Sequence, residues 1–169
     1  MIILGLDPGL ERVGYAFVKR DGSRLIPIDY GLIETPRIDL PSRLAMLYER
    51  LAALIEEHRP DASAIERLLF SVNKTTAMDV AKASGVLILA CKRAGLAVVE
   101  ISPPEVKQAV VGYGSAEKTQ VQFMVAKLLG LKEAPKPDDV ADALAVAIAY
   151  AMRVPAMAAL GKSGANGLK

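Results

Sequence analysis

Four acidic side chains stand at positions from which they could hold metal ions. Asp7 ends the apolar run that opens the chain and precedes a Pro-Gly turn, and Glu66 ends a second, shorter apolar run. Asp139 and Asp142 lie three residues apart at the start of an alanine-rich segment, a spacing that puts both on one helix face. Carboxylate oxygens, in a chain with one cysteine and one histidine, favour Mg²⁺ or Mn²⁺ over zinc.

Clustered carboxylates of this kind would support the hydrolysis of a phosphodiester. Like charges held at the mouth of an apolar core repel one another, and their desolvation is unfavourable unless a cation joins them. Two metal ions in such a cluster can activate a water molecule and stabilise the leaving oxygen, so that no side-chain nucleophile is needed. We therefore expect two Mg²⁺ ions per active site, with Mn²⁺ able to substitute.

Each of these acids also has a simpler explanation. An Asp before Pro-Gly commonly forms a turn, a Glu at a strand end is commonly solvated, and acids in a first helical turn complement the helix dipole. Spacing also leaves Asp138 open as an alternative to Asp139, because Asp138 and Asp142 are four residues apart and share a face equally well. The single histidine, His58, ends an amphipathic segment, which indicates a surface or helix-end group rather than a metal ligand.

Hydrophobic periodicity predicts the elements that must position these acids. Strands are expected over residues 1–6, 12–20, 25–35, 61–66 and 96–101, and helices over 40–58, 74–93, 103–111, 115–130 and 138–151. Ser115 and Asp138 are the expected N-caps of the last two helices. An antiparallel meander followed by helix-linked strands predicts an α/β fold of the ribonuclease H-like kind, with a five-stranded mixed sheet and helices on both faces. Asp7 and Glu66 should then lie side by side on neighbouring strands.

Length and composition predict one domain followed by a tail. The 169 residues fit a single domain over 1–152, and residues 153–169, which carry no periodic apolar stripe, are expected to be mobile. The single cysteine, Cys91, allows no intrachain disulfide. The longest apolar run, 143–152, has ten residues, whereas a bilayer span takes about 20. We expect a soluble, cytoplasmic protein with no signal peptide and no membrane partner.

The charge distribution gives only a local indication of nucleic-acid binding. The net charge of the whole chain is +2, which is not the strong basic footprint of a typical nucleic-acid binder. Between residues 67 and 93, however, five basic residues accompany a single acid, Asp79. This stretch is either a DNA-facing surface or a solvated helix face, and the sequence favours neither.

Four motifs in order resemble the RuvC family of Holliday-junction resolvases. Residues 3–9 (ILGLDPG) resemble the opening motif of the family, 64–66 (AIE) the second, 103–118 the DNA-facing segment, and 139–144 (DVADAL) the final acidic motif. The opening motif alone would be weak, since similar loops are widespread. The resemblance covers residues 1–152 and selects Asp139 over Asp138.

The resemblance implies a homodimeric, magnesium-dependent endodeoxyribonuclease with a ribonuclease H-like fold. Such an enzyme resolves four-way (Holliday) junctions by paired, symmetric nicks that leave 5′-phosphate and 3′-hydroxyl ends, in homologous recombination and DNA repair. By resemblance it works beside a branch-migration motor of the RuvA and RuvB type. The implied catalytic and metal-binding residues are Asp7, Glu66, Asp139 and Asp142.

Further residues are implied to contact DNA. Lys107 and Lys118 match lysines that act near the DNA backbone and count as catalytic, and an ammonium group suits the neutralisation of a phosphate. The family often has an aromatic residue three positions after the second acid, able to stack on a junction base. Here that position is Leu69, followed by Phe70. Either Phe70 makes this contact through a shifted loop or the contact is weaker, and a phenylalanine beside leucines is also a common core residue.

Paired nicking by a chain with one active site requires two chains related by a twofold axis. Ala77, Ala81 and Gly85 recur every four residues in the helix expected over 74–93, and such a small-residue ridge lets two helices approach closely. The ridge could equally pack on the chain's own sheet. Lys74 and Lys82 lie on the same helix, so an interface there would place them at the centre of the junction as candidate DNA-binding residues.

Three competing hypotheses deserve comparison with junction resolution. A ribonuclease H-like nuclease for another substrate, such as RNA–DNA hybrids, would use the same acids and is the principal alternative. An ATP site of the actin-like or sugar-kinase type needs a second lobe and a second phosphate loop, for which 169 residues do not suffice. A catalytically inactive DNA-binding subunit would have no need to keep all four acids.

Overall fold

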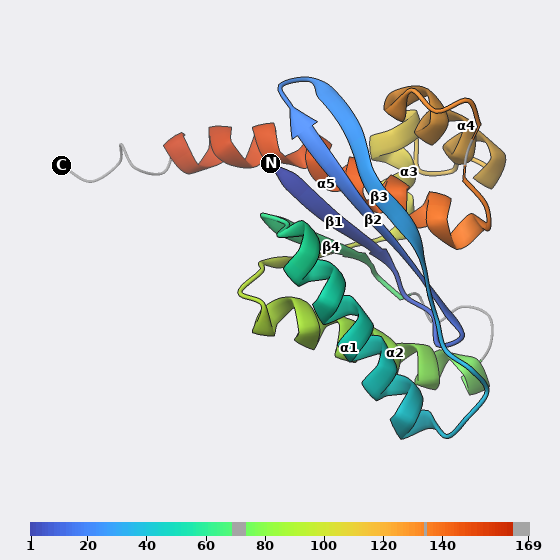
Figure 1. Ribbon diagram of the computed structural model, residues 1–169. Coiled ribbons are helices and arrows are strands. Elements are labelled where there is room, and N and C mark those ends of the chain that lie inside the picture. Colours follow the sequence, from blue (N-terminus) through green and yellow to red (C-terminus); the bar gives the residue numbers. More distant parts are fainter. Residues whose placement is uncertain (69–73, 134, 164–169) are drawn as a thin grey trace.

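The computed structural model describes residues 1–68, 74–133 and 135–163, with only the backbone described for 74–76 and 154–163. A five-stranded sheet with the order β3-β2-β1-β4-β5 forms its centre (Figure 1). The strands are β1 (Ile2–Asp7), β2 (Arg12–Asp21), β3 (Arg24–Glu34), β4 (Ala62–Glu66) and β5 (Val98–Ile101). The first three pair antiparallel, whereas β1, β4 and β5 pair parallel, so the predicted mixed sheet is confirmed.

Helices cover both faces of this sheet, as predicted (Figure 1). One face carries α1 (Leu40–His58) and α2 (Lys74–Arg93), and the other carries α3 (Pro103–Val111), α4 (Lys118–Leu129) and α5 (Asp138–Ser163). Each face has its own apolar core. Leu4, Leu6, Phe17, Leu47 and Leu87 are buried in the α1–α2 core, and Ile3, Val18, Leu144 and Ile148 in the α5 core.

The two-residue period of the strands decides where the first two acids point. In β1, Leu4 and Leu6 enter the α1–α2 core while Ile3 enters the α5 core, and alternation puts Asp7 on the α5 face with Ile3. The same alternation in β4 puts Glu66 on the α5 face. Because Leu6 pairs with Ile65 in the parallel register, both acids lie at the same carboxyl edge of the sheet.

The last helix, α5, lies directly on the bare backbone of two strand glycines. A Cβ atom on Gly5 would overlap the carbonyl oxygen of Ala143, and one on Gly14 would overlap the carbonyl oxygen of Asp139. Alanine predominates along the helix where it meets the sheet, so helix and strands approach without intervening side chains. This contact brings the first turn of α5 against the carboxyl end of β1.

Three predicted helix boundaries were wrong. The helix α4 begins at Lys118 and Ser115 does not cap it, because the backbone N–H of Glu117 donates to Oε1 of Gln120 at 2.8 Å and closes the first turn there. The helix α5 begins at Asp138 itself, whose carboxylate accepts a hydrogen bond from Gln122 at 3.0 Å instead of capping its own helix. The helix α5 also continues past residue 151 to Ser163, so part of the expected tail is helical.

The mobility of residues 153–169 stays a prediction. Among the described residues, none of the helices combines the length and hydropathy that a bilayer span requires.

The contact at Gly14 predicts a strong position dependence of glycine substitution. Gly14→Ala should lower the free energy of unfolding by roughly 1–3 kcal/mol or more, because the overlap is with backbone that can only move by displacing α5. Gly31→Ala is the matched control, since a Cβ there meets only the Tyr15 side chain, which can rotate away. Urea unfolding of both variants measures the difference. Equal losses at the two positions would contradict a rigid contact between α5 and the sheet.

Candidate active site

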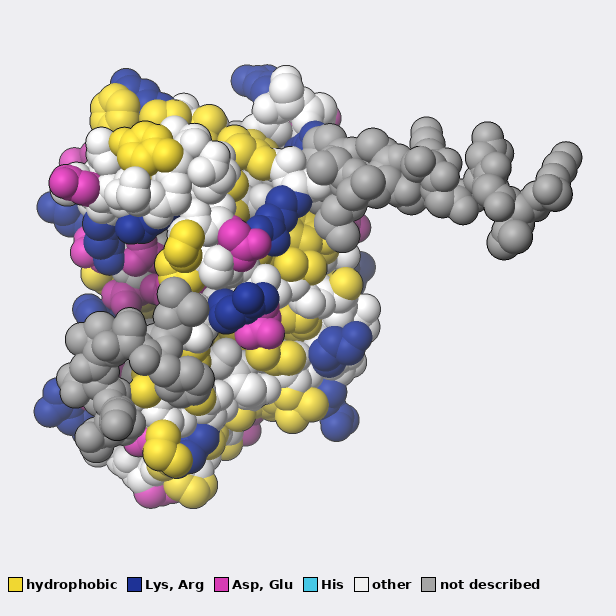
Figure 2. Space-filling view, turned by 180° about the vertical axis from the view of Figure 1, so that it is seen from behind, with side chains coloured by type: hydrophobic (Ala, Val, Ile, Leu, Met, Phe, Trp, Pro, Cys, Tyr) yellow, Lys and Arg dark blue, Asp and Glu magenta, His cyan; other side chains and the backbone are white. Residues whose placement is uncertain are grey.

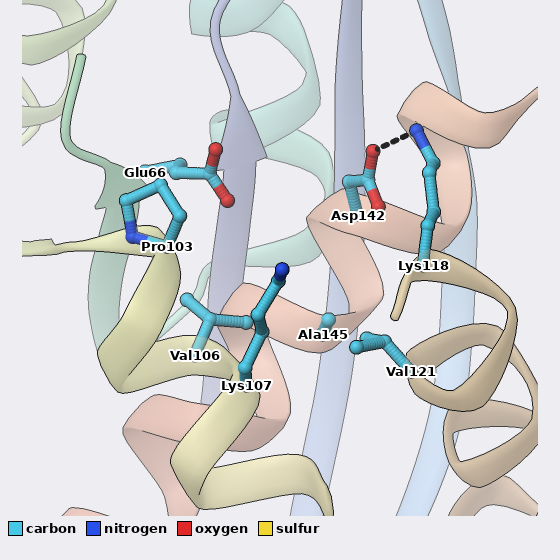
Figure 3. Close-up of a pocket in the computed structure, with 8 residues that line it drawn as sticks. All are labelled: Glu66, Pro103, Val106, Lys107, Lys118, Val121, Asp142 and Ala145. Carbon is cyan, nitrogen blue, oxygen red and sulfur yellow. Dashed lines mark hydrogen bonds and ion pairs between the residues drawn. The ribbon is translucent and has the colours of Figure 1, made fainter. Parts of the chain in front are cut away.

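The predicted acids and lysines meet at a cavity beside the carboxyl ends of β1 and β4. The cavity has a volume of about 190 Å³ and is lined by Glu66, Pro103, Val106, Lys107, Lys118, Val121, Asp142 and Ala145 (Figure 3). These residues come from β4, α3, α4 and α5, which are far apart in the sequence. The opposite view of the molecule shows acidic side chains in a hollow edged by Lys and Arg side chains (Figure 2).

Burial and mutual repulsion hold three of the four acids away from ionisation. Burial raises the pKa of Asp7 to about 8, and the negative charges of Glu66, Asp142 and Asp139 add to the shift. Burial, followed by the charge of Asp142, raises the pKa of Glu66 to about 7. The pKa of Asp142 is also raised by burial, although Lys118 opposes the shift. A cluster of this kind strongly favours a bound cation.

Two lysines bring positive charge to opposite sides of the cavity. Lys118 opens α4, and its Nζ lies 2.9 Å from Oδ2 of Asp142 and 3.3 Å from Oδ2 of Asp138. Burial lowers the pKa of Lys118, but the bonds to these two acids outweigh burial and raise it overall, so the ammonium stays charged. Lys107 reaches into the cavity from α3, and its charge lowers the pKa of Glu66 (Figure 3).

The surroundings of Asp138 and Asp139 differ in a way that spacing did not reveal. Asp138 lies at the exposed rim, where the hydrogen bond from Lys118 and then the bond from Gln122 lower its pKa. Asp139 is better covered and approaches Arg12 at 3.5 Å, and its charge contributes to the raised pKa of Asp7. These contacts support the choice of Asp139 over Asp138 as a member of the inner cluster.

The donor set fits a hard divalent cation, although the carboxylates have not yet converged. Among the described residues, no group of three or more His, Cys, Asp or Glu side chains is already arranged to hold a metal ion. Two of the acids are instead engaged by cations of the chain, Asp142 by Lys118 and Asp139 by Arg12. Asp7 and Glu66, whose raised pKa values show that they lack sufficient counter-charge, are the natural anchors for an incoming ion.

The remaining candidate DNA contacts lie outside this cavity or outside the described residues. Leu69 and Phe70 belong to a segment that the structure does not describe, and so does the side chain of Lys74. Lys82 is exposed on α2, where its Nζ pairs with Oδ1 of Asp79 at 2.9 Å. The cavity therefore unites the two catalytic lysines but not Lys82.

His58 is remote from the acids, as the sequence indicates. It is the last residue of α1, its Nε2 lies 3.1 Å from Oδ2 of Asp29, and its ring packs on Phe17 at a centroid distance of 4.3 Å. It is partly buried rather than a free surface group.

Sequence reasoning missed Arg12 and the apolar wall of the cavity. Strand alternation could have found Arg12, because residues 12, 14 and 16 share the face on which Asp7 points. The wall is formed by Pro103, Val106, Val121 and Ala145 from three different helices. Its members look like ordinary core residues in the sequence, and only the packing of these helices brings them together.

Comparison with known proteins places these features in context. A family model described as crossover junction endodeoxyribonuclease RuvC matches residues 3–150. Crossover junction endodeoxyribonuclease RuvC of Alkaliphilus metalliredigens is 55% identical over 152 residues, 89% of this chain and 93% of the relative. The corresponding protein of Desulfitobacterium hafniense is 51% identical over 155 residues, 91% and 94% of the two chains.

Solved structures give the same result. The structure of Thermus thermophilus RuvC superposes with a TM-score of 0.87 at 33% identity and covers 93% of this chain and 97% of its own. A second structure of that protein, in complex with a Holliday junction substrate, matches with the same score and identity and covers 93% and 96%. The predicted fold class is thereby confirmed.

The raised pKa values predict how stability depends on pH and metal. Between the ordinary pKa values of 3.8 and 4.5 and the folded values of about 8 and about 7, the folded state holds more protons at Asp7 and Glu66 than the unfolded state does. Raising the pH from about 4 to about 8 without metal should therefore withdraw stability, and Mg²⁺ should restore more of it at high pH.

Calorimetry of the metal-free and Mg²⁺-loaded protein across this range measures the effect. Asp7→Asn should raise the metal-free Tm more at the alkaline end than at the acidic end, because the amide cannot ionise. Asp21→Asn, an exposed change at the far end of β2, serves as the control. A Tm difference between Asp7→Asn and wild type that stays constant with pH would show that the acids are not destabilised by one another.

Proposed function

The chain belongs to the RuvC family of crossover junction endodeoxyribonucleases, and on that premise we propose that its acidic cavity resolves Holliday junctions by paired, metal-dependent nicks. The observation that carries the proposal is the meeting of Asp7, Glu66 and Asp142 with Lys107 and Lys118 at one cavity edge. A buried cluster of carboxylates flanked by free ammonium groups suits a phosphodiester rather than a neutral substrate. The reaction serves homologous recombination and DNA repair.

The members of this family are metal-dependent nucleases, and in this chain Asp7, Glu66, Asp139 and Asp142 would hold the metal. We infer two Mg²⁺ ions, for which Mn²⁺ could substitute, because all four donors are hard oxygens. The bound ions would supply Lewis-acid activation of water and of the leaving oxygen. Cleavage at the 3′ oxygen then leaves 5′-phosphate and 3′-hydroxyl ends.

The lysines and the apolar wall perform the work that falls to the chain itself. Lys107 and Lys118 approach the cavity from α3 and α4 and place positive charge where a phosphate would sit between them (Figure 3). Val106, Val121 and Ala145 exclude water from one side of the cavity, which strengthens these electrostatic interactions.

An RNA–DNA hybrid is the less favoured substrate. The same acids would cut it, but the family matched by residues 3–150 is one of junction endonucleases, and a relative of 33% identity has been solved with a Holliday junction. We propose Lys74, Lys82, Leu69 and Phe70 as additional DNA contacts. A partnership with a branch-migration motor of the RuvA and RuvB type and a cytoplasmic location stay predictions.

We propose a homodimer formed through the exposed face of α2. Ala77 and Ala81 are only half-buried, and a Cβ on Gly85 would meet nothing within 4 Å, so the chain's own sheet does not cover this ridge. Met78 and Leu89 on the same helix are 65% and 52% exposed, an unusual position for large apolar side chains. A second copy of α2 would bury them and align two active sites.

The function is tested by incubating the protein with Mg²⁺ and a mobile four-way junction and mapping the nicks on every strand. Nicks at symmetry-related positions of two strands of like polarity, sealable by a ligase, are expected. A linear duplex and an RNA–DNA hybrid of the same sequence are the control substrates. Efficient cleavage of the hybrid with no paired nicking of the junction would replace the proposed function by its alternative.

Amide substitution separates the metal-binding acids from their neighbour. Asp7→Asn, Glu66→Gln, Asp139→Asn and Asp142→Asn should abolish cleavage while junction binding persists, because a neutral amide is a poor ligand for a hard cation. Asp138→Asn is the matched control and should retain cleavage, since Asp138 lies on the exposed rim. Single-turnover rates and gel-shift titrations give the two readouts. Full activity of Asp7→Asn in Mg²⁺ would refute the assignment of the metal site.

A bulky charge on the open ridge should dissociate the dimer. Gly85→Arg should give a monomer that makes unpaired nicks, because the side chain has space within its own chain but not against a second α2. Ala53→Arg, on the exposed side of α1, is the control and should remain dimeric. Sedimentation at micromolar concentration, with and without junction DNA, measures the state. A wild-type monomer in both conditions would be incompatible with the proposed dimer.

A further inference from the structure

Arg12 lies beside the acidic cluster without a role in the proposed chemistry. It is the first residue of β2, and its guanidinium nitrogen Nη2 approaches Oδ2 of Asp139 at 3.5 Å. The contact is held in place by the packing of Asp139 on Gly14, two residues along the same strand. The Arg12 side chain is 51% exposed and the Asp139 side chain 27%, so the guanidinium stands at the solvent edge of the site.

Structural stabilisation does not account for this pair. It is a single long contact at the surface, and pairs of that kind contribute little to the free energy of unfolding. Among the described residues, Asp139 is the only acid with which Arg12 forms an ion pair. Yet the proposed function assigns Asp139 to a metal ion, which would take over the carboxylate.

The charge balance of the site indicates what Arg12 would then bind. Four carboxylates are accompanied by three cationic side chains, and in the metal-free state Lys118 and Arg12 neutralise Asp142 and Asp139. Two divalent ions would add four positive charges to this set. The released cations would then have a surplus of positive charge around them, which only an incoming anion can balance.

We propose that Arg12 is a phosphate-binding residue that exchanges Asp139 for a backbone phosphate of the DNA once divalent metal occupies the acids. The inference rests on the proposed function and extends it. In the strand order, β2 and β4 lie on either side of β1, so Arg12 flanks Asp7 on the side away from Glu66 and Lys107. The DNA strand is therefore gripped on both sides of the cleavage site. A guanidinium suits this role because its planar donors match two phosphate oxygens.

The test is the salt dependence of junction binding by Arg12→Gln, measured by fluorescence anisotropy in Ca²⁺ and separately in a chelator. Each phosphate contact contributes roughly 0.9 to the slope of log K against log salt. In Ca²⁺ the slope of the variant should be smaller than that of wild type by about this amount per active site. In the chelator the two slopes should coincide, because Arg12 is then paired with Asp139. Arg12→Lys should largely keep the wild-type slope in Ca²⁺.

Arg24→Gln is the matched control, since Arg24 is exposed at the far end of the β2–β3 hairpin, and its slope should not respond to Ca²⁺. Unchanged slopes for Arg12→Gln in both conditions, even with a lower Tm, would reduce Arg12 to a structural partner of Asp139 and overturn the proposal. An equal fall in both conditions would also overturn it, because the exchange would not depend on metal. Failure of wild type to prefer a junction over a duplex would refute the proposed function instead, and duplex binding would still test Arg12.

Discussion

The contact between α5 and the bare backbone of β1 and β2 is the constraint on which the rest of the site depends. Helix and sheet meet at Gly5 and Gly14 without side chains between them, so the first turn of α5 is pressed against the carboxyl end of β1. Asp139 and Asp142 thereby reach the edge at which Asp7 and Glu66 already point. A larger residue at either glycine would separate the helix from the strands and disperse the cluster.

This close packing produces an electrostatic conflict that the chain only partly resolves. Burial and proximity raise the pKa values of Asp7 and Glu66, which makes the metal-free site unfavourable for charge. Lys118 and Arg12 relieve the outer acids, and both sit on elements that can release them, an exposed helix start and a strand end. Strain concentrated at a functional site is compensated elsewhere, here by two continuous apolar cores. Stability and reactivity are thus assigned to different layers of one fold.

The two faces of the sheet also divide the work of the molecule. The α5 face carries the acids, lysines and apolar wall. The α1–α2 face leaves a ridge around Gly85 and two large apolar side chains in the open, a surface suited to a second copy. Chemistry and assembly can therefore change independently, since they share the sheet but not its side chains.

Much of this protein was determined by local sequence patterns. Strand and helix periodicity predicted the order of elements and the mixed sheet, because burial repeats every two residues in a strand and about every 3.6 in a helix. The motif residues Asp7, Glu66, Asp142 and Lys118 were identified from type, spacing and resemblance, and the structure brings them to one edge. The helix starts at Ser115 and Asp138 were mispredicted because capping depends on which partner each side chain finds, and Gln120, Gln122 and Lys118 decided that.

Only the tertiary structure decided the role of Arg12, the apolar wall and the raised pKa values. Each depends on groups distant in sequence that approach within a few ångströms, and pattern reasoning sees neighbours along the chain rather than across it. The same holds for Asp138 and Asp139, which spacing could not separate. Packing against Gly14 turns one toward the core and leaves the other at the rim, because a helix laid on a sheet has one side that is covered and one that is not.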